Sequence, residues 1–197
     1  MAGRAEPTRR KVKAEESKNR IYEAALALFG EKGFERTTIL DITARAGVAI
    51  GTFYHHFQSK DGVLEENFRR ADEEFARYAA SPDCREGVMA DRLLRYLDRY
   101  SLLIEETGLD LIRQIYTYRN KLFLKKGRAM QDGLIALVRE GQERSELKTD
   151  LSPEELCDYL FMGARGVVFH WCLLDGGSDI RALMRAYFSR LLPLFVR

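Results

Sequence analysis

The chain has 197 residues, of which 46% are hydrophobic and 31% are charged, and its formal net charge is +2. This balance is typical of a globular protein with an ordinary core and excludes a disordered chain. The most apolar stretch, residues 159–174, is interrupted by Arg165 and His170 and is shorter than the roughly 18 to 20 residues of a bilayer span. Because the basic N-terminus also lacks the apolar stretch of a secretory signal, we expect a cytoplasmic protein with no membrane partner.

Candidates for a metal or catalytic site are few. The sequence has three cysteines, an odd number, and none of them forms a Cys-x-x-Cys pair: Cys84, Cys157 and Cys172. We interpret them as reduced, buried thiols, with redox sensing as the alternative. His55 and His56 are adjacent and would point about 100° apart on a helix, so they do not chelate one ion together. The sequence also has no Gly-rich phosphate loop and no nucleophile elbow. We therefore expect no metal, no cofactor and no catalytic residue.

Positive charge is concentrated at the front of the chain. Residues 1–60 hold 11 Lys or Arg against 7 Asp or Glu, whereas residues 61–197 hold 21 against 23. Residues 1–17 show no apolar periodicity, and we predict that they form a mobile basic arm. A basic front favours a polyanionic partner, although a solvated tail has the same composition.

The segment that follows the arm, residues 18–62, has the pattern of a three-helix domain. Apolar residues recur at helical spacing in its first part, and Gly33 supplies the helix stop. Thr38 and Asp41 then form a Thr-x-x-Asp capping box for a second helix, and a glycine turn separates it from a third helix at about residues 49–56. Two short helices joined by such a turn make a helix-turn-helix. Its expected core contains Leu28, Phe29, Ile42, Phe53 and Phe57.

The remainder of the chain, residues 63–197, also has helical patterns. Ser59 is a suitable N-cap for a fourth helix that ends near Ala80, and Ser152 with Pro153 marks the start of a later one. Further helices are expected at about residues 87–104, 109–118, 128–144, 153–174 and 180–192, with a loop at 80–86 and an undecided segment at 119–127. No segment shows strand alternation, so we predict an all-α fold of about nine helices.

The helix that contains residues 159–174 is apolar on every side, and such a helix must be covered all round. A second subunit would cover one face, and Gly163 would allow close helix approach; a central helix in a monomeric bundle is the alternative. We therefore expect a homodimer, in which the interface also uses the apolar stripe of the last helix. The predicted interface residues are Gly163, Val167, Trp171, Leu183, Tyr187, Phe188 and Leu191.

The stretch between residues 21 and 60 resembles the DNA-binding signature of the TetR family of bacterial transcriptional regulators. The matching residues are Gly33-Phe34, Thr37-Thr38, Asp41-Ile42, Ala46-Gly47-Val48, Gly51-Thr52-Phe53-Tyr54, His56-Phe57 and Ser59-Lys60. The resemblance implies a regulator that binds double-stranded operator DNA, most often a repressor that a small hydrophobic or amphiphilic effector releases from a palindromic operator. Residues 63–197 would then form a ligand-binding and dimerisation domain.

A recognition helix needs small residues where it enters the major groove and polar side chains that reach phosphates or base edges. By resemblance, the phosphate contacts fall to Thr38, Tyr54, His56 and Lys60, although Lys60 as a solvated lysine is the alternative. Ala49 departs from the family, since many members have a capping Ser there, and Ile50 favours a thymine methyl. The full predicted DNA-binding set is Thr38, Ala49, Ile50, Gly51, Thr52, Tyr54, His55, His56 and Lys60.

The resemblance also implies an effector cavity in the C-terminal part. Candidate lining residues are Tyr96, Tyr100, Arg113, Tyr116, Phe123, Phe161, Arg165 and Phe169. Arg165 needs a negatively charged partner on its apolar helix, either an Asp or Glu of a neighbouring helix or subunit or an anionic effector such as a fatty acyl species. If the protein supplies the carboxylate, an aromatic or cationic hydrophobic effector is equally open. Two alternatives to an effector-controlled regulator stay open, namely a DNA-bound architectural or partner-binding protein of the same fold, and an enzyme.

Overall fold

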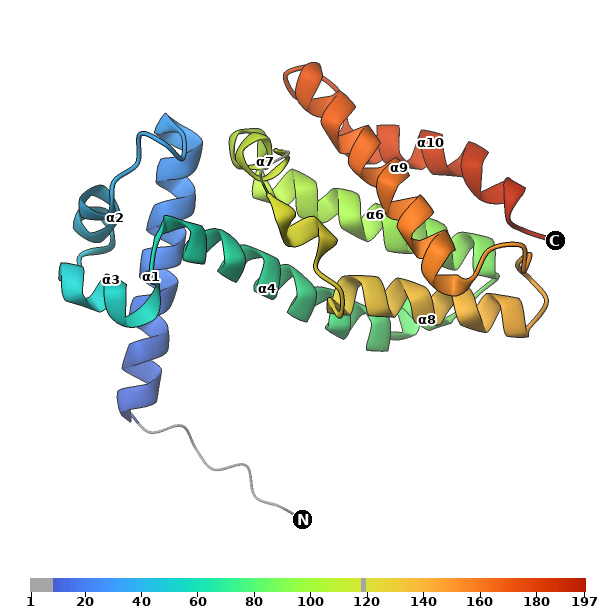
Figure 1. Ribbon diagram of the computed structural model, residues 1–197, viewed down its shortest axis with the longest axis horizontal. Coiled ribbons are helices and arrows are strands. Elements are labelled where there is room, and N and C mark those ends of the chain that lie inside the picture. The colour runs from blue at the N-terminus through green and yellow to red at the C-terminus, as the bar shows by residue number, and fades with distance from the viewer. Residues whose placement is uncertain (1–8, 118–119) are drawn as a thin grey trace, which may run out of the picture. The chain divides into compact units, whose positions relative to one another are not determined.

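The computed structural model describes residues 9–117 and 120–197, and these fold into ten α-helices and two short 3-10 helices (Figure 1). Within these residues the secondary structure contains no β-strand beyond one isolated bridge between Leu147 and Val196. The predicted all-α class is confirmed. The chain divides into two compact units, one that ends at Asn67 and one that comprises Phe68–Arg197.

The first unit contains α1 (Arg9–Lys32), α2 (Ile39–Ala46), α3 (Ile50–His56) and the start of α4 (Lys60–Ala80). The predicted capping box is confirmed, because Thr38 accepts the Asp41 N–H and Asp41 accepts the Thr38 N–H. Gly47 ends α2 with a φ of +63°, a left-handed conformation that glycine adopts without a steric penalty. Apolar side chains that are closed off from solvent form the core of this unit, and the fully buried ones include Ile21, Phe29, Ile42 and Phe53.

The prediction of a mobile arm over residues 1–17 is wrong for residues 9–17, which form the first turns of α1. These residues are mostly Arg, Lys, Ala and Glu, which have high helix propensity, and tertiary contacts fix the turn that follows. The Lys18 Nζ lies 2.9 Å from the Glu66 carboxylate, and the Ser17 hydroxyl lies 2.8 Å from Nε2 of His56. Residues 1–8 lie outside the described part of the chain.

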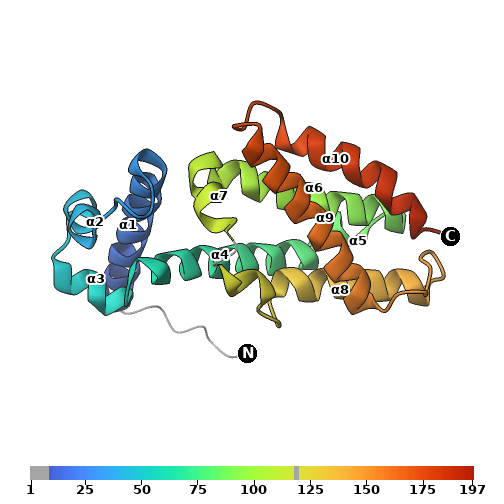
Figure 2. The same cartoon turned by 45° about the horizontal axis from the view of Figure 1, so that its top comes forward.

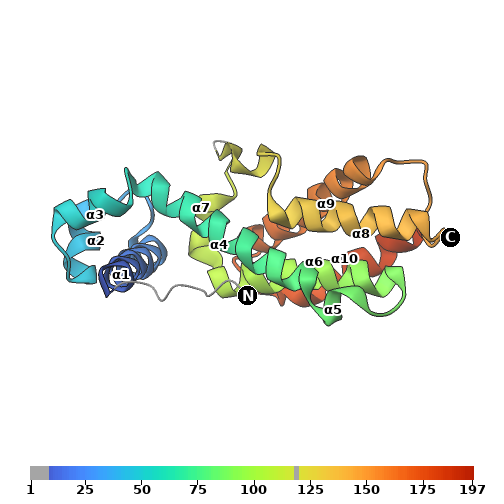
Figure 3. The same ribbon diagram turned by 90° about the horizontal axis from the view of Figure 1, so that it is seen from below.

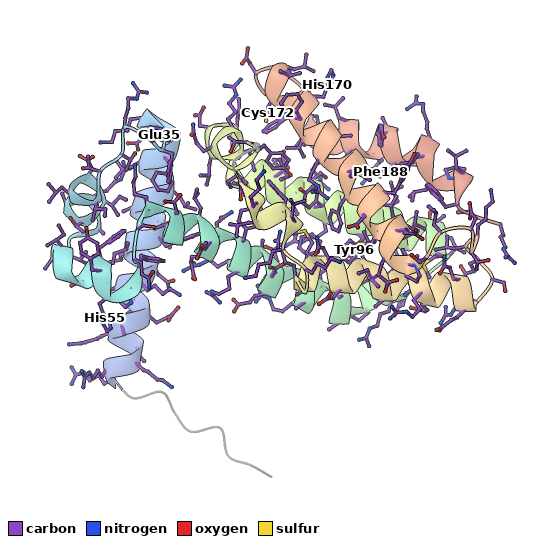
Figure 4. All side chains as sticks on the ribbon, in the orientation of Figure 1. Glu35, His55, Tyr96, His170, Cys172 and Phe188 are labelled. Carbon is purple, nitrogen blue, oxygen red and sulfur yellow. The ribbon has the colours of Figure 1, made fainter. Side chains whose placement is uncertain are left out.

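The second unit is a helical bundle (Figure 2). Its elements are the rest of α4, α5 (Pro82–Arg85), α6 (Met89–Thr107), α7 (Leu109–Ile115), η1 (Lys121–Leu124), α8 (Ala129–Glu143), α9 (Pro153–Leu173), α10 (Ile180–Leu191) and η2 (Leu192–Leu194). Helix α6 packs against both α10 and α8, and α8 lies beside α9 (Figure 3). Tyr96 and Phe188 are fully buried inside this bundle (Figure 4).

Two boundaries differ from the prediction. The expected loop at residues 80–86 contains the short helix α5, because Pro82 stands at its first turn, where a missing N–H costs nothing. Helix α7 ends at Ile115 rather than near residue 118, and the undecided segment contains η1. The extra helix α5 explains why the described residues form ten α-helices instead of about nine.

Helix α9 begins where the sequence predicts. Ser152 accepts the Glu155 N–H, Glu155 accepts the Ser152 N–H, and Pro153 occupies the first turn. One side of α9 is buried in the unit, but its other side exposes Tyr159, Met162, Phe169 and Leu173. The single chain therefore covers only one side of this apolar helix. In the described part of the chain, no helix has the length and apolar character needed to span a membrane.

A buried ion pair joins α6 to α8. The Arg92 guanidinium is 1% exposed, donates to both oxygens of the Glu140 carboxylate at 2.9 and 2.7 Å, and donates to the Cys84 carbonyl. These hydrogen bonds from Arg92 lower the pKa of Glu140. Glu140 is partly exposed, so its removal should cost less than the loss of a fully buried partner.

Glu140→Gln is expected to lower the free energy of unfolding by about 2 kcal/mol at pH 7, because it leaves the buried Arg92 charge without its counterion. Because the pKa of Glu140 is lowered in the folded state, its contribution is present above the unfolded-state pKa of about 4.3 and is lost as the pH falls below that value. Urea unfolding at pH 7 and pH 3.5 measures both effects. Glu143→Gln, at an exposed position of α8, is the control. An equal effect of the two substitutions at pH 7 would refute the assignment.

Candidate DNA-binding surface, ligand groove and subunit interface

Helix α3 has one buried and one exposed face. Phe53 and Phe57 anchor it in the core, with 0% and 5% of their surface exposed. The opposite face exposes Ala49, Ile50, Gly51, Tyr54 and His55, and His55 can be located in Figure 4. As the departure from the family pattern leads one to expect, Ala49 makes no side-chain cap hydrogen bond at the start of the helix. The exposed side chains are small at Ala49 and Gly51, near the start of the helix, and longer at Tyr54 and His55, toward its end.

Gly51 is not required by the fold of the unit. A Cβ atom at this position would meet no atom within 4 Å, and its φ lies outside the left-handed region. A glycine that neither the backbone nor the neighbouring side chains demand suits a surface that another molecule approaches closely.

The remaining candidates for DNA contact are bonded inside the unit. The Thr38 hydroxyl donates to Asp41 at 2.6 Å, and Lys32 lies 2.6 Å from the same carboxylate. Hydrogen bonds from Lys32 and Thr38 hold the pKa of Asp41 well below its usual range. The Thr38 hydroxyl therefore serves the helix cap, and Thr52 is half-buried. Thr38 itself is exposed, and its contact with a phosphate stays a prediction.

His56 and Lys60 also form hydrogen bonds within the unit, and their contact with phosphates stays a prediction. The His56 ring is half-buried against Ser17, and burial followed by the nearby His55 charge lowers its pKa. The Lys60 Nζ donates to the Phe34 carbonyl at 2.7 Å and lies 4.6 Å from the centre of the Phe34 ring. Since a cation–π contact and a carbonyl acceptor already hold this ammonium, we assign Lys60 to the support of the turn after α1.

The second unit has a groove of about 750 Å³ between α8, α9 and the segment around η1. Its lining residues are Phe123, Leu124, Lys126, Gly127, Gln131, Asp132, Ile135, Arg139, Glu154, Cys157, Asp158, Met162 and Arg165. Arg139 and Glu154 neutralise one another at 2.9 Å. The groove thus combines apolar walls with charged groups of both signs.

Arg165 is the half-buried cation of this groove. Its Nε donates to the Phe161 carbonyl at 3.0 Å, and its guanidinium carbon lies 5.7 Å from the centre of the Phe123 ring. Among the described residues, no carboxylate lies within ion-pair distance of Arg165, so the prediction of a protein carboxylate as its partner within one chain is wrong. Its guanidinium is available to a carboxylate of a second subunit or to a negatively charged ligand.

A cluster of aromatic residues adjoins Arg165. The hydroxyls of Tyr100 and Tyr116 form a hydrogen bond, and burial raises the pKa of both. The Tyr116 and Phe123 rings lie 4.9 Å apart, and the Tyr100 and Phe161 rings 5.7 Å apart. This cluster connects the groove to the core of the unit.

Only two of the eight residues predicted to bind an effector line the groove, namely Phe123 and Arg165. Tyr96 is fully buried and donates to the Met130 carbonyl at 2.7 Å. Arg113 lies on the surface with Asp175, and Phe169 is 54% exposed on the outer side of α9. Aromatic composition does not distinguish residues of the core from residues that line a cavity, because both surroundings are apolar.

Sequence reasoning missed the residues of α8 that line the groove. Gln131, Ile135 and Arg139 follow one another at four-residue spacing on one face of α8, which is also the pattern of an ordinary solvated helix face. Cys157 lines the groove as well, and burial raises the pKa of its thiol to about 12. This raised pKa opposes redox sensing by Cys157.

A second hollow, of about 700 Å³, lies on the outer surface of α9 and α10. It is lined by Tyr159, Met162, Gly163, Gly166, Val167, His170, Leu183, Ala186 and Tyr187. Four of the predicted interface residues are among them. Trp171 and Phe188 instead belong to the core, since the Trp171 indole donates to the Ser178 carbonyl and Phe188 is 0% exposed. Leu191 is half-buried against the same core.

The comparisons with known proteins agree with this arrangement. Residues 21–66 match the family model of bacterial regulatory proteins, tetR family. The HTH-type transcriptional repressor DhaR of Mycobacterium sp. strain GP1 is 28% identical, over 88% of this chain and 91% of its own length.

Two solved structures share the fold. One is the transcriptional regulator FadR from Bacillus subtilis in complex with stearoyl-CoA, with a TM-score of 0.75, 20% identity and coverage of 87% of this chain and 95% of that one. The other is a transcriptional regulator from Saccharomonospora viridis in complex with choline, with a TM-score of 0.69, 20% identity and coverage of 93% and 99%. Residues 21–66 thus form a DNA-binding domain of the tetR family of bacterial regulatory proteins, and the chain is similar over most of its length to a transcriptional repressor.

Proposed function

We propose that this regulator is a repressor that binds a palindromic operator as a homodimer and is released by a small amphiphilic effector. The observation that carries the DNA-binding part is the exposed face of α3, from Ala49 to His55, on a helix whose other face is fixed by Phe53 and Phe57. A rigid helix with a small, open leading end fits the major groove of DNA.

The roles on this face follow from side-chain size. Ala49 and Gly51 would allow close approach to the bases, and Ile50 would contact a thymine methyl. Tyr54, which is 55% exposed, would reach a phosphate or a thymine methyl, and His55 would contact the backbone. The side chains that would make these contacts are exposed, and the fold of the first unit does not depend on them.

Dimerisation would use the hollow on α9 and α10. Tyr159, Met162 and Tyr187 of this hollow are exposed in the single chain. Gly166, where a Cβ atom would meet nothing within 4 Å, would let a second helix approach closely. Two recognition helices about 34–36 Å apart would then read two half-sites on one face of the DNA.

The effector would bind in the groove at Arg165. The Phe123 ring, which lines the groove, contacts Phe68 of α4 edge-on at 5.3 Å, and Arg128 at the start of α8 bonds to Asp72 of α4 at 3.0 Å. Helix α4 begins in the first unit. A ligand that displaces Phe123 would therefore favour a different position of α4 and lower the population that fits the operator. A DNA-bound protein of the same fold without an effector would have no use for this groove.

Arg165→Met is expected to leave a dimer that binds DNA with unchanged affinity but that an anionic amphiphile no longer releases. The test measures release of the wild type and the variant from selected operator DNA by fluorescence anisotropy, with stearoyl-CoA as the anionic probe and choline as the cationic one. Arg113→Met, which removes a surface cation of the same unit, is the control and should respond like the wild type. Release of Arg165→Met by stearoyl-CoA, or of the wild type by choline alone, would contradict the assignment.

A further inference from the structure

The first turns of α1 form a basic surface that the family signature does not include. The family model matches from residue 21, whereas α1 begins at Arg9. Residues 9–20 contain six Lys or Arg against two Glu. Arg10 and Lys13 are exposed, and within the described part of the chain neither has an ion pair. Lys18 pairs with Glu66, but no described contact of the first unit accounts for the charges of Arg10 and Lys13.

One hydrogen bond places this surface beside the recognition helix. The Ser17 hydroxyl lies 2.8 Å from Nε2 of His56, the last residue of α3. Lys13 and Arg10 precede Ser17 by four and seven residues, so they lie on the same face of α1, about 6 and 10 Å farther toward its N-terminus. Figure 1 shows α1 continuing past the end of α3 in this direction. The exposed residue His55 lies next to this junction.

The acidic residues of the same turns project away from the direction of Ser17, although the Glu15 charge still reaches the His56 ring and opposes the lowering of its pKa. At 100° per residue, Glu16 projects about 100° and Glu15 about 160° away from the direction of Ser17. Arg10 and Lys13 are therefore the charged residues of the first two turns that lie in the direction of Ser17. Two such cations, which form no ion pair with a described residue, fit the spaced negative charges of a nucleic-acid backbone.

We propose that Arg10 and Lys13 bind DNA phosphates next to the half-site that α3 reads, so that each protomer contacts a longer stretch of the duplex. This inference rests on the proposed DNA binding and extends it to a second contact surface. These two residues bind without regard to sequence, because phosphate contacts position a protein on the duplex whereas base contacts specify the site.

The test compares the wild type with Arg10→Ala/Lys13→Ala on a labelled 30-base-pair duplex of random sequence, by anisotropy between 50 and 300 mM KCl. The slope of log affinity against log salt is expected to become shallower by about 0.9 for each lost phosphate contact, which is about 1.8 per protomer. The affinity at 100 mM KCl should fall by at least about tenfold. Arg10→Lys/Lys13→Arg keeps both charges and should keep the wild-type slope.

Arg77→Ala/Lys125→Ala is the matched control, since it removes two exposed cations of the second unit and should leave the slope unchanged. Thermal unfolding of the test variant should match the wild type, because both side chains are exposed. A wild-type slope in Arg10→Ala/Lys13→Ala, or an equal loss in the control, would overturn the inference and leave the proposed function standing. A wild type that binds no duplex would overturn both.

Discussion

Gly166→Glu is expected to convert the dimer into a monomer and to lower operator affinity by about a thousandfold or more, since only one half-site contact remains. A Cβ atom at Gly166 meets nothing within 4 Å in the single chain, so the folded monomer accommodates the new side chain. In the dimer the carboxylate would be buried without a partner against α9 or α10, which costs several kcal/mol. Val167 would be a poorer site for this test, because it is 8% exposed and a charge there would also damage the core.

Analytical ultracentrifugation separates the two states of this 22.7-kDa chain. We expect the wild type to sediment as a dimer at micromolar concentration and Gly166→Glu as a monomer with an unchanged helical spectrum. Ala136→Glu adds the same charge at an exposed position of α8 and should remain a dimer. A dimeric Gly166→Glu, or a monomeric wild type, would show that the hollow on α9 and α10 is not the interface.

Tyr54→Ala is expected to lower operator affinity by about a hundredfold while the stability of the protein is unchanged. A dimer loses the contact in both half-sites, and about 1 to 1.5 kcal/mol for each gives about 2 to 3 kcal/mol in total. Tyr54 is 55% exposed and touches Phe53 only edge-on, so its removal leaves no cavity in the core. Tyr54→Phe separates the hydroxyl from the ring: retained affinity would assign a thymine methyl, and lost affinity a phosphate. An Ala variant that binds like the wild type would remove Tyr54 from the DNA-binding surface.

Much of the fold could be predicted because its signals are local. The capping boxes at Thr38 and Ser152 each involve residues three positions apart, and both are present. The burial of Phe53 and Phe57 follows from helical spacing within one short helix. The first turns of α1 could not be predicted in the same way, because residues 9–17 carry no apolar stripe and depend on the contacts that fix Ser17 and Lys18 to α3 and α4.

The site depended more on tertiary contacts, and sequence reasoning was weaker there. Lys60 bonds to a carbonyl 26 residues away, and His56 to a hydroxyl 39 residues away, so their inward direction has no local signature. Phe188 shares the apolar stripe of α10 with Tyr187, yet one is fully buried and the other 44% exposed. A stripe predicts burial but does not say whether the same chain or a second copy provides the cover.

Selection of binding sites from a random-sequence DNA library, followed by a measurement of how many protomers occupy the selected duplex, tests the central claim most directly. We predict an enriched inverted repeat whose half-site centres lie about 10 base pairs, or a multiple of that, apart, with a dimer on each site. No enriched sequence, or a single unrepeated site occupied by one protomer, would contradict a dimeric operator-binding regulator.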